Sequence, residues 1–90
     1  MKNETSENRI IQVKDLNIGN NIKYYRKRAG YKQNELVAKL QLKGIDISVY
    51  SYNRIEKGTQ NPTVHLLLTL CDLFECDMNA IFGFAPLAND

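Results

Sequence analysis

Apolar residues recur every three or four positions in several stretches of this chain, a spacing that places them on one face of an α-helix. The first stretch predicts a helix that ends at Gly30, with inward positions Ile18, Ile22, Tyr25 and Ala29. The second predicts a helix over residues 33–42, broken at Gly44, with inward positions Leu36, Val37 and Leu40. Ile45 and Ile47 then alternate with polar residues, which indicates a short extended turn.

Residues 49–57 predict a third helix with two different faces. Tyr52 and Ile55 lie three residues apart and can point inward. Ser48 is well suited to cap the start of this helix and Gly58 to end it. The opposite face is polar and basic, and its residues are Tyr50, Asn53, Arg54 and Lys57. A short capped helix that presents hydrogen-bond donors to solvent can enter the major groove of DNA.

A fourth helix, opened by Pro62 or Thr63, carries the clearest amphipathic pattern in the chain. Its expected inward stripe is Val64, Leu67, Leu68, Cys71 and Phe74. A short fifth helix follows, capped by Asp77, stopped by Gly83 and containing Met78, Ile81 and Phe82. The predicted fold class is all-α, with one domain over residues 15–84, a partly disordered N-terminal arm over residues 1–14 and a tail over residues 85–90.

Charge is distributed unevenly along the 90 residues. Residues 16–58 carry nine Lys or Arg and three Asp or Glu, a net charge of +6. Residues 59–90 carry no Lys or Arg and four Asp or Glu, a net charge of −4. The formal net charge of the whole chain is only +2. The basic segment suits a polyanion and the acidic segment would repel one, although an unevenly charged solvated surface is the alternative interpretation.

The remaining chemistry argues against several functions. No apolar run approaches the roughly 20 residues that span a bilayer, and the polar N-terminus is not a signal peptide, so we expect a cytoplasmic protein without membrane contact. His65, the only histidine, has no Cys or carboxylate at metal-ligand spacing on one helical face. Neither Cys71 nor Cys76 has a plausible His and carboxylate partner set. We therefore expect no catalytic residue, no metal, no cofactor and no enzymatic activity.

Several residues are individually weak signals but specific as an ordered set. They are Ile18, Gly19, Ile22, Arg26, Gly30, Gln33, Leu36, Leu40, Ser48, Ile55, Glu56, Gly58, Asn61, Pro62, Leu67, Leu70 and Leu73. In this order and spacing they resemble the phage-repressor-like (Xre/Cro) helix-turn-helix family, from about Ile18 to Phe84. The resemblance implies a compact five-helix domain, here with an extended turn between helices two and three.

The resemblance and the capped, polar face of the third helix together predict which residues bind DNA. The resemblance implies Gln33, Val49, Tyr50, Ser51, Arg54, Lys57, Thr59 and Asn61, and the third helix adds its cap Ser48 and the polar-face residue Asn53. Among them, Gln33 would contact phosphate or brace the recognition helix, Arg54 would reach a base edge, and Lys57 would meet a phosphate, as would Thr59 and Asn61. Arg26 and Glu56 have a different role, as an internal ion pair that joins helix one to helix three.

Two departures from the family pattern concern the packing of helix three. Val37 stands where a small alanine usually permits close helix packing, and Tyr52 replaces a usual aliphatic residue. Both side chains are larger than the residues usual at these positions. An outward shift of the recognition helix is therefore one possible consequence.

The leading function class is a sequence-specific transcriptional regulator, a repressor, that binds double-stranded DNA. A homodimer on a near-palindromic operator would supply specificity that one recognition helix lacks. The expected dimer seam is Phe74, Met78, Ile81, Phe82 and Phe84. The alternative class is a protein-interaction module, or an antitoxin-like partner of another protein, that uses the acidic, apolar C-terminal half.

Overall fold

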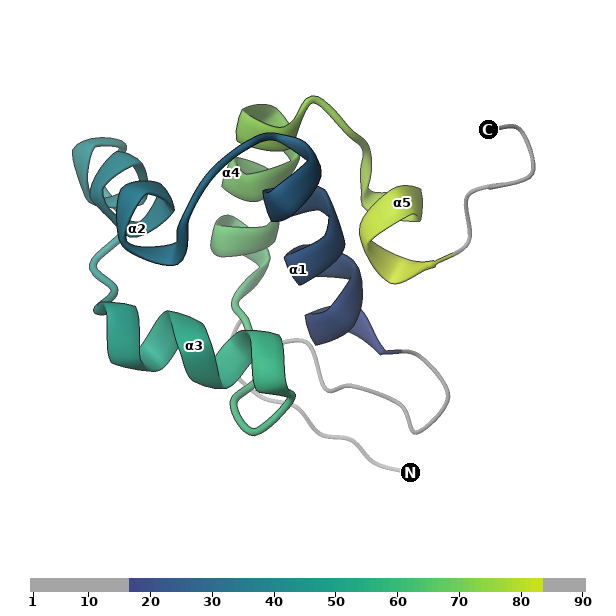
Figure 1. Cartoon of the computed structure of the whole chain (residues 1–90), viewed down its shortest axis with the longest axis horizontal. Helices are drawn as coiled ribbons and strands as arrows, with labels where there is room; N and C mark the ends of the chain where they lie inside the picture. Colours follow the sequence, from purple (N-terminus) through teal and green to yellow (C-terminus); the bar gives the residue numbers. More distant parts are fainter. Residues whose placement is uncertain (1–16, 84–90) are drawn as a thin grey trace.

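The computed structural model describes residues 17–83, which form five helices joined by short turns (Figure 1). They are α1 (Ile18–Arg28), α2 (Gln33–Leu42), α3 (Val49–Lys57), α4 (Val64–Phe74) and α5 (Met78–Phe82). The predicted all-α fold class is confirmed, and α2 and α3 have the expected bounds. The expected arm over residues 1–14 and the tail over residues 85–90 lie outside the described residues.

Polar side chains at the helix starts satisfy backbone N–H groups that a helix leaves without intrahelical partners. The capping oxygens of α1, α4 and α5 belong to Asn17, Thr63 and Asp77. The start of α2 differs because Lys32 has no side-chain acceptor. The backbone N–H of Lys32 instead donates to Glu35 Oε1 at 2.8 Å, so a side chain of α2 itself stabilises the first turn of the helix.

The hydrophobic core lies where α1 packs against α3, α4 and α5. In Figure 1, α1 runs between α3 and α5, and α2 is attached mainly through its packing on α3. The fully buried apolar side chains come from all five helices and include Ile18, Ile22, Leu36, Leu40, Tyr52, Ile55, Leu67, Leu70 and Ile81. The position of α3 is therefore set by contacts with α1 and α2 together.

Three of the expected inward positions are wrong, two in α4 and one at the end of α1. The buried face of α4 consists of Leu66, Leu67, Leu70, Cys71 and Phe74. Val64 and Leu68 are instead 36% and 53% exposed. Apolar residues surround most of α4, so their spacing alone did not decide which face meets the core. Ala29 is also exposed, because α1 ends at Arg28 and Ala29 follows as its C-cap.

Gly19 lies at a close contact between α1 and α3. A Cβ atom at this position would lie 2.4 Å from the carbonyl oxygen of Glu56 and 2.6 Å from that of Ile55. Both oxygens belong to the backbone of α3, which cannot move aside as the end of a flexible side chain would. Glycine at position 19 therefore allows α3 to lie against α1.

We expect Gly19→Ala to destabilise the domain, although alanine normally improves a helix interior over glycine by about 0.5–1 kcal/mol. The added methyl group would push α1 away from α3, and overpacking of this kind typically costs about 1–3 kcal/mol. Asn20→Ala, at the next and exposed position, is the control. Denaturant unfolding followed by circular dichroism measures both free energies. A Gly19→Ala protein at least as stable as the wild type would show that this contact yields without cost.

Candidate nucleic-acid interface

Both ends of α3 are fixed by local hydrogen bonds. At its start, Ser48 Oγ accepts a 3.0 Å hydrogen bond from the N–H of Ser51. At its end, Gly58 has a φ of 83°, a left-handed conformation that glycine adopts without a Cβ clash. The inner face is anchored by Tyr52 and Ile55, as predicted, and both are buried. Since Val37 is buried as well, the core accommodates both of the larger side chains near α3.

The outer face of α3 carries residues expected to contact bases. Tyr50 is 72% exposed, Val49 is exposed, and Arg54 is half-buried. The guanidinium carbon of Arg54 lies 5.7 Å from the centre of the Tyr50 ring, a cation–π contact. Such a contact contributes about 0.5–1 kcal/mol at an exposed site. It restricts the Arg54 side chain to the side of α3 that carries Tyr50.

Beneath this face, the buried Glu56 carboxylate accepts four hydrogen bonds. Arg26 donates two of them, from Nε to Oε2 at 2.7 Å and from Nη2 to Oε1 at 3.2 Å. The Tyr52 hydroxyl donates to Oε2, and Gln33 Nε2 donates to Oε1 at 3.0 Å. A carboxylate has about four lone-pair sites, so its capacity is filled. The expected ion pair between Arg26 and Glu56 is thus present, with side chains 8% and 3% exposed.

Opposing effects act on the pKa of Glu56. Burial alone would raise this pKa, because a charged carboxylate is disfavoured away from water. The hydrogen bonds from Arg26, Tyr52 and Gln33 outweigh burial and hold the pKa below its ordinary value of 4.5. For the Tyr52 hydroxyl, burial and the hydrogen bond to Glu56 both raise the pKa far above its ordinary value. At neutral pH the carboxylate is therefore charged and the hydroxyl protonated.

Gln33 and Asn53, two residues expected to bind DNA, are hydrogen-bonded to each other. Asn53 Nδ2 donates to Gln33 Oε1 at 3.2 Å, and both residues are half-buried. Because Gln33 begins α2 and Asn53 lies within α3, this bond joins the two helices. Gln33 therefore braces α3 against α2, while its expected contact with phosphate stays a prediction.

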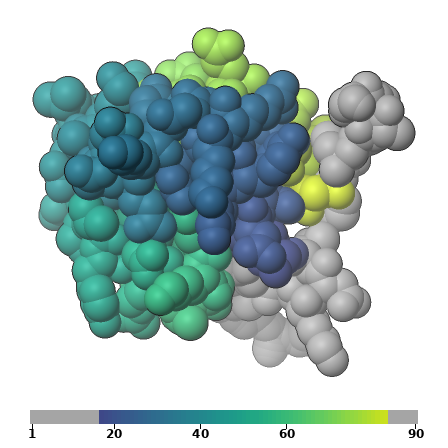
Figure 2. Space-filling model, viewed as in Figure 1, coloured from purple at the N-terminus to yellow at the C-terminus, as the bar shows by residue number. Residues whose placement is uncertain are grey.

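A cationic cleft of about 290 Å³ lies between α1 and the adjoining parts of α2 and α3. Its lining residues are Asn20, Lys23, Arg26, Lys27, Gln33, Asn53, Glu56 and Lys57. Since Arg26 and Glu56 neutralise each other, the exposed Lys23, Lys27 and Lys57 set its charge. Figure 2 shows the surfaces of α1, α2 and α3 adjoining on one face of the molecule.

Sequence reasoning missed the contribution of α1 to this cleft, which comes from Asn20, Lys23 and Lys27. Lys23 and Lys27 are four residues apart, so they lie on one side of α1. That spacing was a usable signal for a basic stripe. It did not reveal that the stripe would lie beside the start of α2 and the end of α3.

The remaining expected residues lie on the other side of α3 or at its ends. Ser51 and Asn61 line a hollow of about 260 Å³ together with the extended turn that precedes α3. Thr59 is exposed, and its N–H donates to the Arg54 carbonyl oxygen at 2.9 Å, which closes the end of α3. The expected set is therefore divided between two flanks of α3, with Val49, Tyr50 and Arg54 on its outer face.

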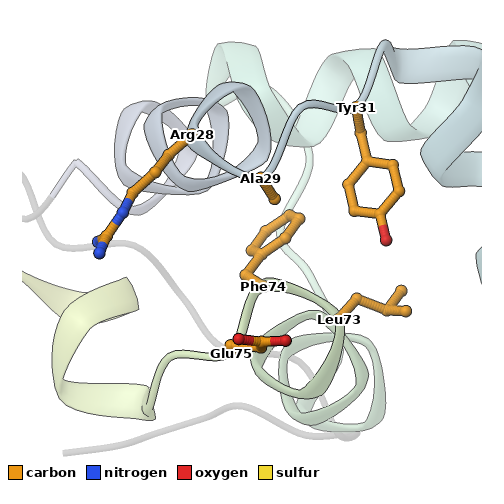
Figure 3. A pocket seen from close by; sticks show the side chains of 6 residues that line it. All are labelled: Arg28, Ala29, Tyr31, Leu73, Phe74 and Glu75. Carbon is orange, nitrogen blue, oxygen red and sulfur yellow. The ribbon is translucent and has the colours of Figure 1, made fainter.

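A further hollow of about 350 Å³ lies at the C-terminal ends of α1 and α4 (Figure 3). It is lined by Arg28, Ala29, Tyr31, Leu73, Phe74 and Glu75. In Figure 3, the Phe74 ring lies near Ala29, while the Arg28 side chain extends away from Tyr31. This hollow contains no residue expected to bind DNA, and its two charged residues are opposite in sign. This hollow is therefore separate from the cationic cleft.

Other chemistry is limited in the part of the chain that the structure describes. Within residues 17–83, no group of three or more His, Cys, Asp or Glu is placed to hold a metal ion. His65 is exposed, Cys71 is buried, and Cys76 is half-buried. Over the same residues, no helix combines the length and the apolar character needed to cross a membrane.

Residues 22–81, from α1 to α5, match the family described as helix-turn-helix, of the phage-repressor-like (Xre) kind. The matched region contains all of α2 and α3 and most of the cationic cleft. The chain therefore belongs to this helix-turn-helix family, whose domains bind DNA and regulate transcription. No curated protein sequence shows a significant match to the chain.

Replacement of Arg26 by methionine should be strongly destabilising. Arg26→Met would leave the Glu56 charge buried without its ionic partner, and breaking a buried pair in this way typically costs about 3–5 kcal/mol. Lys43→Met is the matched control, since it breaks the exposed 3.6 Å ion pair with Asp72. That change should cost about 0–1 kcal/mol. Equal losses for the two variants in urea unfolding would contradict the buried role of Arg26.

Acid should destabilise the wild type more than a Glu56→Gln variant. A carboxyl group whose pKa is lowered by folding stabilises the protein fully above its unfolded pKa, near 4.5, and this contribution disappears as the pH falls through the lower folded pKa. Melting temperatures at a series of pH values from neutral to strongly acidic would measure the effect. At neutral pH the Glu56→Gln variant should have a lower melting temperature than the wild type. Below pH 4.5 its melting temperature should fall less steeply than that of the wild type. Parallel curves for the two proteins would contradict this assignment.

Proposed function

We propose that this protein is a sequence-specific regulator of transcription, a repressor, that binds double-stranded DNA and reads the major groove with α3. The observation that carries the proposal is the exposed face of α3 beside a cleft whose charge is set by three lysines. Phosphate contacts provide affinity and register on DNA, and base contacts provide sequence choice. The proposal includes no cofactor and no catalytic residue, and it places the protein in the cytoplasm with its DNA.

Base contacts are assigned to the outer face of α3. Val49, Tyr50 and Ser51 occupy its first turn, the part of a recognition helix that enters the groove first. Arg54 follows one turn later and can donate two hydrogen bonds to the O6 and N7 atoms of guanine. The contact between Arg54 and Tyr50 supports this role, because it restricts a long side chain before DNA binds.

Phosphate contacts are assigned to both flanks of α3. Lys57 shares the cationic cleft with Lys23 and Lys27, so residues of α1 add to the expected set. Asn61, which lines the hollow on the other flank, and Thr59, just beyond the end of α3, are the further proposed contacts. Each lysine that neutralises a phosphate releases a condensed counterion, which makes binding dependent on salt.

The distribution of acidic residues favours one orientation towards DNA. Asp72, Glu75 and Asp77 are exposed in α4 and in the turn that leads to α5, where the chain has no Lys or Arg. A polyanion is therefore attracted to the face formed by α1 and α3 and repelled from the end of the domain that carries these carboxylates.

A protein-interaction module, including an antitoxin-like partner, is the second candidate function. The observation that favours it is the exposure of Val64 and Leu68 on α4, within the acidic half of the chain. Exposed apolar residues of this kind can mark a protein-binding surface. A gel shift on mixed-sequence DNA over a salt series separates the two candidates, because only the DNA-binding protein should show salt-dependent retardation.

The variants Arg54→Ala and Lys57→Ala should affect DNA binding differently. Arg54→Ala should lower discrimination at one base position by about 1–3 kcal/mol, because it removes a base contact. Lys57→Ala should weaken binding to all DNA sequences similarly, because it removes a phosphate contact. It should also reduce the slope of log affinity against log salt concentration by about one unit. Lys39→Ala, an exposed lysine outside the cleft, is the charge control. Unchanged sequence preference in Arg54→Ala would show that Arg54 reads no base.

A homodimer on DNA is the second part of the proposal, and burial within one copy limits which of the expected residues we assign to its interface. Phe74 and Ile81 are 8% and 0% exposed within a single copy, so they belong to the core and not to the surface. Met78 and Phe82 are only half-buried and can still be shared with a second copy. Phe84 lies outside the described residues. The exposed parts of Met78 and Phe82 are therefore the proposed centre of the interface.

The dimer should be visible on a near-palindromic operator. Two copies whose recognition helices lie one DNA turn apart, about 34 Å, would contact two half-sites. Analytical ultracentrifugation with a selected operator should give two protein chains for each duplex. Met78→Lys should reduce the complex towards one chain for each duplex, while Asn79→Lys, at the adjacent exposed position, is the control. A saturated complex of one wild-type chain for each duplex would rule out the dimer.

A further inference from the structure

Tyr52 brings a polar atom into a part of the core that an apolar ring could fill. Its side chain is fully buried, and its hydroxyl donates a hydrogen bond to Glu56 Oε2. The same carboxylate accepts a hydrogen bond from Gln33 through its other oxygen, Oε1. The Tyr52 hydroxyl is therefore one hydrogen bond from Glu56 and two from Gln33, and both of these side chains line the cationic cleft.

The direction of each hydrogen bond along this path is determined by chemistry. An ionised carboxylate can only accept, so Gln33 must turn its NH2 group towards Glu56 and its carbonyl oxygen Oε1 away from it. Oε1 then accepts from Asn53 Nδ2. One N–H of each amide and the Asn53 oxygen Oδ1 stay available for a further partner. A reversed Gln33 or Asn53 amide would break this sequence of bonds.

We propose that Tyr52 is a positioning residue for DNA recognition. Its hydroxyl fixes the Glu56 carboxylate, the carboxylate orients Gln33, and Gln33 orients the Asn53 amide towards an adenine in the major groove. Asparagine pairs with adenine by accepting from N6 and donating to N7, so a fixed amide orientation is a condition for reading that base. The inference rests on the proposed DNA-binding function and adds a buried determinant of its specificity.

The Tyr52 hydroxyl has this effect because it completes the set of donors around Glu56. Without it, Oε2 keeps only the bond from Arg26 Nε, while Oε1 is still shared by Arg26 and Gln33. The carboxylate can then rotate towards Arg26, which weakens its bond to Gln33. Gln33 and Asn53 would regain rotational freedom that must be lost again when DNA binds.

The central test compares Tyr52→Phe with Ile55→Val. Tyr52→Phe removes the hydroxyl and keeps the ring, whereas Ile55→Val removes one methylene from another buried residue of α3 and leaves the hydrogen bonds intact. Selection from random DNA and fluorescence anisotropy would measure base preference and affinity. Tyr52→Phe should lower affinity for the selected site about two- to tenfold, flatten the preference for adenine at one position and leave affinity for scrambled DNA unchanged. Ile55→Val should lower only the melting temperature.

A double-mutant cycle tests whether the effect passes through Gln33. Tyr52→Phe should have no further effect on base preference in a Gln33→Ala background, because the connection to Asn53 is already lost. An equal effect with and without Gln33 would overturn the proposal, as would an unchanged adenine preference in Tyr52→Phe. If circular dichroism showed that Tyr52→Phe does not fold, the cycle of Gln33→Ala with Asn53→Ala would replace it. Independent effects of those two changes would also overturn the proposal.

A measurement on the free protein separates this inference from the proposed function. In nitrogen-15 NMR spectra, the side-chain amide resonances of Gln33 and Asn53 should shift in Tyr52→Phe and stay unchanged in Tyr24→Phe, which alters an exposed tyrosine. Shifts without any specific DNA binding by the wild type would refute the DNA-binding function and, with it, the role of Tyr52 in recognition. Specific binding by the wild type without these shifts would refute the positioning role alone.

Discussion

A buried carboxylate is stable only if its charge and its lone pairs find partners, and Glu56 meets this condition by drawing on three helices. Its donors are Arg26 from α1, Gln33 from α2 and Tyr52 from its own helix α3. Apolar contacts alone would permit small rotations of α3 about its axis. A saturated carboxylate does not, because rotation would leave a charged group unsatisfied away from water. The hydrogen bonds to Glu56 therefore add to the apolar packing in fixing the angle at which α3 presents its outer face.

The same arrangement shapes the charge of the surface. Since Arg26 and Glu56 neutralise each other inside the domain, the cleft above them takes its sign from Lys23, Lys27 and Lys57. Exposed carboxylates are concentrated elsewhere, in α4 and near the start of α5. A small domain with a modest total charge of +2 can in this way carry a strongly directional field.

Stability and the proposed recognition share several residues. Gly19 permits the close contact between α1 and α3, and the buried hydrogen bonds then hold Gln33 and Asn53 in one orientation. A site built on packed helices in this manner needs little rearrangement before it binds, which lowers the entropic cost of association. It also means that changes to the buried hydrogen bonds around Glu56, and not only to the surface, are expected to alter sequence preference.

The sequence by itself determined the helices, because caps, glycines and apolar spacing act over only a few neighbouring residues. The bounds of α3, its buried Tyr52 and Ile55, and the pairing of Arg26 with Glu56 all followed from such patterns or from the family resemblance. Only the tertiary structure decided which face of the largely apolar α4 is buried, and it corrected the inward assignment of Leu68. It also placed Lys23 and Lys27 beside Lys57 and joined Tyr52 to Gln33. These relations join residues far apart in the chain, and helical periodicity carries no information about which helices become neighbours.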